Sequence, residues 1–225
     1  MNDTRDSLHR IAIHVLARAR FDATGRFGLR ATPGGFGTPM FGEDLFRVAG
    51  GALVREHGGD ASAMPLDGAT LADLAAFAGV DLTTPFDAGE ATPPVGDTHA
   101  PLRVDAAEAA RMAEWFDFGW RVIDAAAAAR PDANAVQLWP EHFDAGTSVA
   151  IAEDERCNLG ASPGDAFSDE PYLYVGPWSD RRPGDASYWN APFGAAVTRA
   201  DVFAAQDPFE TGVGFLCRGL DLLRG

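Results

Sequence analysis

The segment LWPEHFD, residues 138–144, gathers three groups that could do acid–base chemistry. Glu141, His142 and Asp144 lie within four positions, directly after a proline that interrupts an apolar strand. Histidine is the one side chain that titrates near neutral pH without help. A carboxylate of Glu141 or Asp144 could orient one ring nitrogen of His142, while the other nitrogen takes a proton from a substrate. The same histidine could equally cap the end of the strand, and both interpretations stay open.

Further candidate residues follow in 163–193. Asp165, on the turn SPGDAF, could supply another carboxylate. Tyr172 and Tyr174 alternate with apolar residues, so both phenols should face one side of a strand. Phenols, indoles and carboxylates could form a pocket wall, or the same face could lie under a helix. Two arginines could hold an anionic group of a substrate. The candidate substrate-binding residues are Tyr172, Tyr174, Trp178, Arg181, Arg182 and Trp189.

Other chemistries have weaker signals in the sequence. Glu141, His142, Asp144 and Asp165 would suit Mg²⁺ or Mn²⁺ better than Zn²⁺, but their spacing matches no known metal motif. No nucleophile elbow surrounds Ser162, and the glycines of residues 34–37 match no nucleotide-binding loop. We therefore expect neither a metal nor a cofactor, and a metal-dependent hydrolase is the weaker alternative.

Three of these segments together carry a resemblance. LWPEHFD, GASPGD and PYLYVGPW, in this order, resemble a bacterial family of domains of unknown function that is common in actinobacteria. Its members carry W-P-x-H-F-D, G-x-S-P-G-D and P-Y-x-Y-V-x-P-W segments. The resemblance covers residues 137–195, about a quarter of the chain. It implies membership of an uncharacterised family and no particular reaction.

The amino-acid composition of the chain limits the classes of partner and substrate that it could bind. The formal net charge is −15, from 33 acidic and 18 basic residues, and every basic residue is arginine. An acidic chain is a poor partner for nucleic acids and anionic membranes, and it favours a cationic or amine-bearing substrate. The absence of lysine excludes lysine Schiff-base chemistry and a Walker A loop. The N-terminus lacks the features of a signal peptide, so we expect a cytoplasmic protein with its two cysteines inert.

Hydrophobic periodicity predicts the elements that would position these groups. Helices are expected over residues 4–20, near 68–79, over 105–129 and from about 208. A β-hairpin should turn at Gly50-Gly51, with Phe46, Val48 and Leu53 on one face. Four strands of a β-meander are expected in NAVQLW, TSVAIA, RCNLGAS and PYLYVG.

The order of these elements predicts one α+β domain over residues 1–225. A mostly antiparallel sheet, made of the hairpin and the meander, should pack against a central buried helix and terminal helices. Residues 81–101, rich in Pro, Thr and Asp, could be a lid or an internal boundary. Arg10, His14 and Arg18 form a stripe that is either a solvated face or an anion site.

Three hypotheses for function remain. The first is a cofactor-independent acid–base enzyme, a lyase or ring-closing eliminase of specialised metabolism, acting on a small amine-bearing metabolite with an anionic leaving group. In that case His14 or His57 could join His142 through the fold. The second is a non-catalytic module that binds a carbohydrate or another small ligand. The third is a structural or interaction protein, with a possible homodimer through Gly212 and Gly219 of the last helix.

Overall fold

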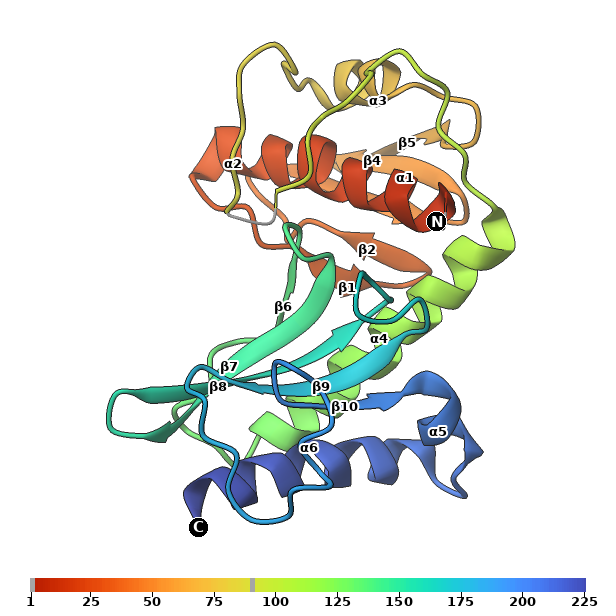
Figure 1. The fold of residues 1–225 in the computed structure, drawn as a ribbon. Helices are drawn as coiled ribbons and strands as arrows, with labels where there is room; N and C mark the ends of the chain where they lie inside the picture. The colour runs from red at the N-terminus through yellow and green to blue at the C-terminus, as the bar shows by residue number, and fades with distance from the viewer. Residues whose placement is uncertain (1–2, 90–91) are drawn as a thin grey trace. The chain divides into compact units, whose positions relative to one another are not determined.

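The computed structural model describes residues 3–89 and 92–225, which form helices and two antiparallel five-stranded sheets (Figure 1). The predicted α+β class is thereby confirmed. The chain groups into two compact units, the first made of residues 1–117 with 138–143 and the second of 118–137 with 144–225. The segment 81–101, predicted as a lid or boundary, lies within the first unit.

One helical run opens the first unit and confirms the helix predicted over 4–20. It consists of α1 (Asp3–Ile11), a π-helical segment η1 (Ala12–Ala17) and α2 (Arg18–Thr24). The second helix of this unit, α3 (Leu71–Ala78), begins at a capping box between Thr70 and Asp73 and ends at Gly79. Both signals are local, so the sequence predicted this helix correctly.

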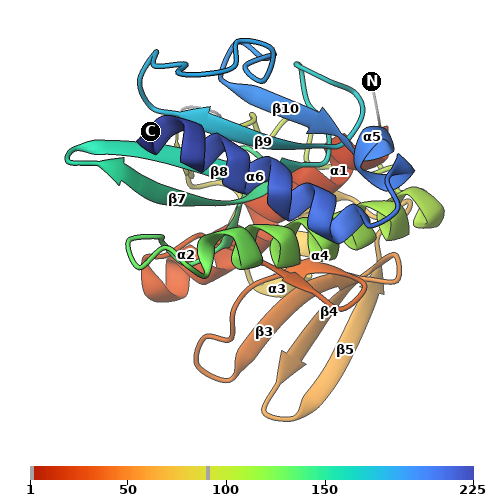
Figure 2. The ribbon, with the colours of Figure 1, turned by 90° about the horizontal axis from the view of Figure 1, so that it is seen from below.

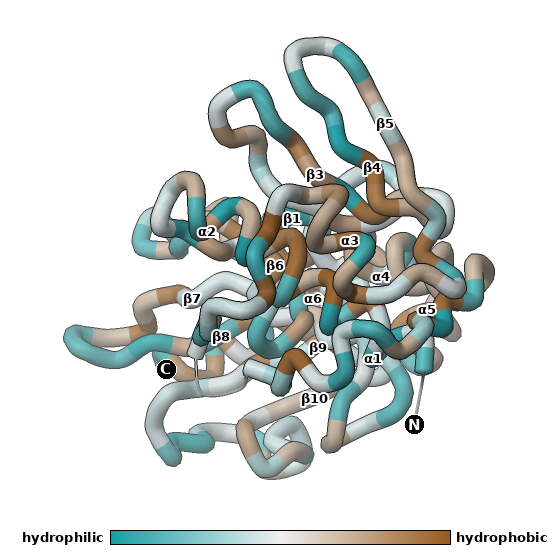
Figure 3. The backbone as a smooth tube through the Cα atoms, turned by 90° about the horizontal axis from the view of Figure 1, so that it is seen from above, coloured by the Kyte–Doolittle hydropathy of each residue, from teal (hydrophilic) through white to brown (hydrophobic). Residues whose placement is uncertain are grey.

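The first sheet has the order β1-β2-β3-β4-β5. Its strands are β1 (Arg30–Thr32), β2 (Gly35–Gly37), β3 (Asp44–Ala49), β4 (Ala52–His57) and β5 (Asp60–Pro65). The hairpin of β3 and β4 turns at Gly50 and Gly51, whose φ angles of 58° and 77° suit a two-residue turn. The predicted face of Phe46, Val48 and Leu53 is buried. The far end of the β4–β5 hairpin is hydrophilic (Figure 3). Strands β1, β2 and β5 were not predicted.

Helix α4 (Ala106–Ala127) contributes to both units and confirms the predicted central buried helix. The Asp105 side chain accepts a hydrogen bond from the Glu108 backbone N–H at 2.8 Å and so caps the start of this helix. The Thr4 hydroxyl accepts a hydrogen bond from the Asp105 backbone N–H at 3.0 Å. In the second unit, a Cβ on Gly119 would lie 2.3 Å from the Ala161 Cβ, so glycine permits a close approach of helix and strand at this position.

The second sheet has the order β10-β9-β8-β7-β6 and contains the predicted meander. Its strands are β6 (Gln137–Trp139), β7 (Asp144–Ala152), β8 (Glu155–Ser162), β9 (Tyr172–Pro177) and β10 (Ala195–Thr198). Two helices follow, α5 (Arg199–Ala204), which was not predicted, and α6 (Pro208–Arg224), which was. Asp207 caps α6 by accepting from the N–H groups of Phe209 and Glu210.

Helix α6 lies across the strands of the second unit (Figure 2). Its two glycines make this packing close, because a Cβ on Gly212 would contact Leu173 and a Cβ on Gly219 would overlap Val175. The glycine face that was predicted to receive a partner helix therefore contacts the chain's own sheet. Among the residues that the structure describes, no helix combines the length and the apolar character needed to cross a membrane.

Candidate functional site

In the turn that holds the LWPEHFD motif, the Phe143 side chain is buried and the His142 side chain is exposed. The Phe143 side chain is 2% exposed and its backbone adopts a positive φ of 55°. Its ring stacks on the His9 ring at 5.1 Å and meets the edges of Phe36 at 5.1 Å and Phe116 at 5.3 Å. The motif thus anchors the turn of residues 139–143 in an aromatic cluster of the first unit.

Glu141 and His142 are the two titratable residues of this turn. The His142 ring is exposed, and within residues 3–89 and 92–225 it makes no hydrogen bond or ion pair. Glu141 is half-buried, and its Oε2 is a buried atom without a hydrogen-bond partner in the same residues. Burial raises the pKa of Glu141 above its ordinary value, and this effect outweighs the attraction of the neighbouring His142.

The carboxylates of Asp144 and Asp165 lie in the second unit, each bonded to a tyrosine of β9. The Tyr174 hydroxyl donates to Asp144 Oδ2 at 2.5 Å, and the Tyr172 hydroxyl donates to Asp165 Oδ2 at 2.6 Å. The two phenol rings lie 6.1 Å apart on one face of the sheet, as the alternation predicted. Burial, with the nearby carboxylates, raises the pKa of both phenols above their ordinary value. Both tyrosines therefore remain protonated donors at neutral pH.

Strand β8 shapes this tyrosine–carboxylate cluster. A Cβ on Gly160, the residue opposite Tyr174 in the sheet, would lie 2.2 Å from the Tyr174 ring. Glycine at this position therefore makes room for the phenol. Phe193 stacks on Tyr172 with ring centroids 6.1 Å apart, and the Phe193 ring also meets the edge of Tyr174. The predicted site residues thus form two groups: Glu141 with His142 in the first unit, and the two aspartate–tyrosine pairs in the second.

The other predicted substrate-binding residues make contacts within the segment that follows β9. Trp178 is 65% exposed, and its Nε1–H donates to Asn158 at 2.8 Å. The Arg182 guanidinium donates to backbone carbonyls of Ser179, Arg181 and Phe193 and lies over the Trp189 ring. Arg181 lies 3.6 Å from a Glu155 carboxylate oxygen. Arg182 therefore braces this loop through three hydrogen bonds to backbone carbonyls.

The stripe of Arg10, His14 and Arg18 binds the loop that follows α3. Arg10 donates to the carbonyl oxygens of Val95 and Asp97 at 2.7 and 2.8 Å. His14 Nε2 lies 2.9 Å from the Pro93 oxygen, and Arg18 donates to the Thr84 oxygen at 2.9 Å. Each residue of the stripe therefore contacts a backbone carbonyl of this loop, and the Arg18 Nε–H also pairs with the Asp22 carboxylate at 2.7 Å. The remaining candidate, His57, bonds Asp44 at 3.0 Å, so neither it nor His14 joins His142.

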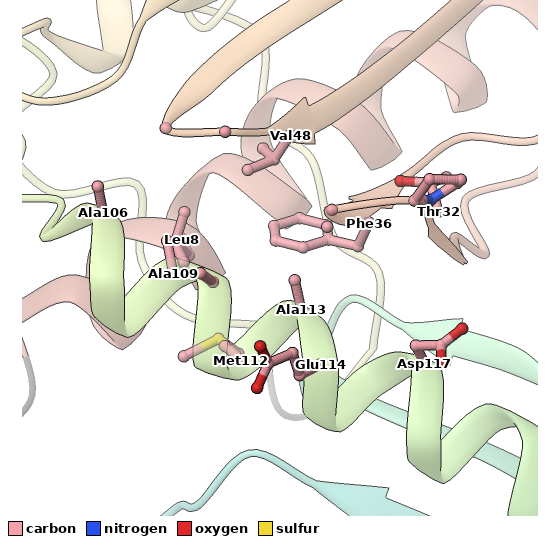
Figure 4. Close-up of a pocket in the computed structure, with 16 residues that line it drawn as sticks. Leu8, Thr32, Phe36, Val48, Ala106, Ala109, Met112, Ala113, Glu114 and Asp117 are labelled. Carbon is pink, nitrogen blue, oxygen red and sulfur yellow. The ribbon is translucent and has the colours of Figure 1, made fainter.

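A cavity of about 390 Å³ lies in the first unit, between the start of α4 and the glycine-rich turns of the first sheet. That volume falls in the usual range of small-molecule sites, roughly 300–1,000 Å³. Figure 4 shows Ala109 and Ala113 of α4 pointing toward Phe36 and Val48, which form the opposite wall. Small side chains on the helix and backbone at Gly34, Gly35, Gly50 and Gly51 leave the space open.

One part of this cavity is polar. Glu114 and Asp117 of α4 line it, and Figure 4 shows the Asp117 carboxylate directed toward the side where Thr32 lies. Thr32 Oγ1 is a buried atom that has no hydrogen-bond partner among the described residues. Sequence patterns alone did not predict this site. Its available signals were the run ATPGGFGT and the small residues Ala106, Ala110 and Ala113, which share one face of a predicted helix.

The placement of the His, Cys, Asp and Glu side chains bears on metal ligation and thiol chemistry. Within residues 3–89 and 92–225, no group of three or more His, Cys, Asp or Glu side chains is placed to hold a metal ion. Burial raises the pKa of the Cys157 thiol to about 12 and also raises the pKa of Cys217. Both thiols are free and remain protonated at neutral pH.

Comparison with known proteins adds no assignment, because no protein-family model, curated protein or solved structure matches the chain.

Proposed function

We propose that the protein binds a small, largely apolar molecule in the cavity of about 390 Å³ in its first unit. The observation that carries this proposal is the combination of a sufficient volume with an apolar wall and a few polar groups. Leu8, Phe36, Val48 and Met112 supply the apolar surface, and Thr32 supplies a hydroxyl. Binding sites for small molecules have this composition, in which apolar contacts give affinity and a few polar groups give orientation.

A cavity-filling substitution tests this proposal. Ala110 lines the cavity and is itself exposed, so Ala110→Leu should occupy ligand space without disturbing the core. Ala107→Leu is the matched control, because Ala107 is exposed on the same helix and does not line the cavity. Titration of hexan-1-ol, followed by two-dimensional NMR, should shift amide signals of cavity residues in the wild type and in Ala107→Leu. Equal shifts in Ala110→Leu would contradict binding at this place.

Acid–base catalysis at Glu141 and His142 is a second candidate function. It is favoured by the exposed, unpartnered His142 ring next to a half-buried carboxyl group whose pKa is raised. Such a pair could take a proton from a substrate and return it during one reaction. The reaction would be a lyase or ring-closing elimination on a small amine-bearing metabolite with an anionic leaving group.

A comparison of variants tests the catalytic proposal. Wild-type protein, His142→Ala and Glu141→Gln would each be incubated with a mixture of small amines, and new or vanishing masses recorded. We expect product formation in the wild type that falls at least about 100-fold in His142→Ala, since general acid–base groups contribute roughly 10²–10⁴-fold. Turnover that persists in a folded His142→Ala variant would exclude this role.

A further inference from the structure

The charged side chains that line the cavity of the first unit are both acidic. Glu114 and Asp117 are its two charged residues, and its remaining walls are apolar side chains, glycine backbone, Pro33 and the Thr32 hydroxyl. In the part of the chain that the structure describes, the Glu114 carboxylate pairs with no cation. The cavity therefore offers an unneutralised negative charge beside apolar surface.

We infer that the ligand of this cavity is an amphipathic cation, with a protonated amine at one end and an apolar body. This inference rests on the proposed function and specifies its ligand. The ammonium group would lie next to Glu114, and the body would lie between the alanines of α4 and the Phe36 ring. A carboxylate ligand of the same shape would meet repulsion at Glu114, so the site discriminates by charge.

The Thr32 hydroxyl adds a second polar contact. Thr32 Oγ1 is buried and unpartnered within the described residues, and a buried hydroxyl without a partner is unfavourable. A hydroxyl can accept a hydrogen bond from the N–H group of an amine or donate one to a ligand oxygen. Amino alcohols could therefore satisfy Glu114 and Thr32 together, and they should bind more tightly than plain amines of equal length.

The overall charge of the protein supports the same ligand class but does not determine it. A chain with a net charge of −15 attracts cations everywhere on its surface, so a weak general attraction must be separated from the local one. Asp124 allows this separation, because it is an exposed carboxylate of the same helix that does not line the cavity. Asp124→Asn changes the net charge as much as Glu114→Gln does.

The experiment compares three probes of equal length, which are hexylammonium, hexan-1-ol and hexanoate, by NMR titration of the full chain. We expect hexylammonium to bind most tightly, with a Kd on the order of a millimolar for so small a molecule. Glu114→Gln should weaken hexylammonium binding by about three- to fivefold and leave hexan-1-ol binding unchanged. Asp124→Asn should change neither by more than about twofold.

Each other outcome has a definite meaning. Equal affinity for hexylammonium and hexan-1-ol, or equal weakening by Glu114→Gln and Asp124→Asn, would overturn the inference and leave the binding function intact. If none of the three probes shifts signals of cavity residues, the proposed binding function fails and the inference fails with it. Tighter binding of hexanoate than of hexylammonium would show that the cavity prefers an anion, and it would overturn the inference that the ligand is a cation.

Discussion

The aromatic anchor of the 139–143 turn makes a sharp prediction about two adjacent residues. Phe143→Ala removes a ring that is 2% exposed and contacts Phe36, Phe116 and His9. Truncation of a buried phenylalanine to alanine costs about 3–5 kcal/mol of unfolding free energy, because the transfer energy is lost and a cavity remains. His142→Ala removes an exposed ring without partners in the described structure, so it should change stability by less than about 0.5 kcal/mol.

The positive φ of Phe143 adds a second, independent test. Alanine at φ 55° keeps the steric cost of the left-handed conformation, whereas glycine adopts it freely. Phe143→Gly should therefore be more stable than Phe143→Ala by up to about 1 kcal/mol, the reverse of the usual order of these residues. The three variants differ from the wild type in one turn only, so they form a matched set.

Urea unfolding monitored by tryptophan fluorescence and circular dichroism measures these differences. With a slope of roughly 2–3 kcal/mol/M, the expected loss in Phe143→Ala lowers the unfolding midpoint by more than about 1 M. If the two units unfold in separate transitions, we expect the shift in the transition that changes the fluorescence of Trp115, a residue of the first unit. A loss below about 1 kcal/mol in Phe143→Ala, or an equal loss in His142→Ala, would refute the anchor.

Two further predictions concern the helices. Gly119→Ala should destabilise the protein by about 1–3 kcal/mol, because the new Cβ would lie 2.3 Å from the Ala161 Cβ. Gly214 has open space around it, so Gly214→Ala should stabilise α6 by up to about 1 kcal/mol. Thermal unfolding distinguishes them, and equal shifts would contradict the close approach at Gly119. Burial lowers the pKa of His9 and His14 below 6.5, so the unfolded chain binds protons more readily and stability decreases as the pH falls below about 6.5. A His14→Gln variant should show a smaller loss of urea midpoint between about pH 8 and pH 5.5, and an unchanged loss would exclude this origin.

Much of the fold could be predicted because its signals are local. Asp207 before Pro208 marks the start of α6, and Gly79 marks the end of α3 through interactions within a few residues. The Gly50-Gly51 turn sets the register of β3 with β4, and the alternation around Tyr172 and Tyr174 places both phenols on one face. These features depend on periodicity and on backbone preferences, which a single sequence displays directly.

Strands β2 and β5 escaped prediction because they are defined by their pairing partners and not by their own residues. Strand β2 (Gly35–Gly37) contains two glycines, which have low strand propensity, and exists because it pairs with β3. Strand β5 (Asp60–Pro65) has a largely exposed face without apolar alternation. Its register against β4 comes from the sheet as a whole.

For the candidate sites, the difference between what the sequence shows and what only the tertiary structure shows is larger. The sequence by itself determined which side chains are available: acidic groups in excess, arginine as the basic residue, and a histidine in a turn after a proline. Only the tertiary structure decided that Phe143 fills the aromatic cluster, that Asp144 bonds Tyr174, and that Glu114 lines a cavity. The physical reason is that burial, partner distance and cavity volume arise from contacts between residues far apart in the chain, which local patterns do not encode.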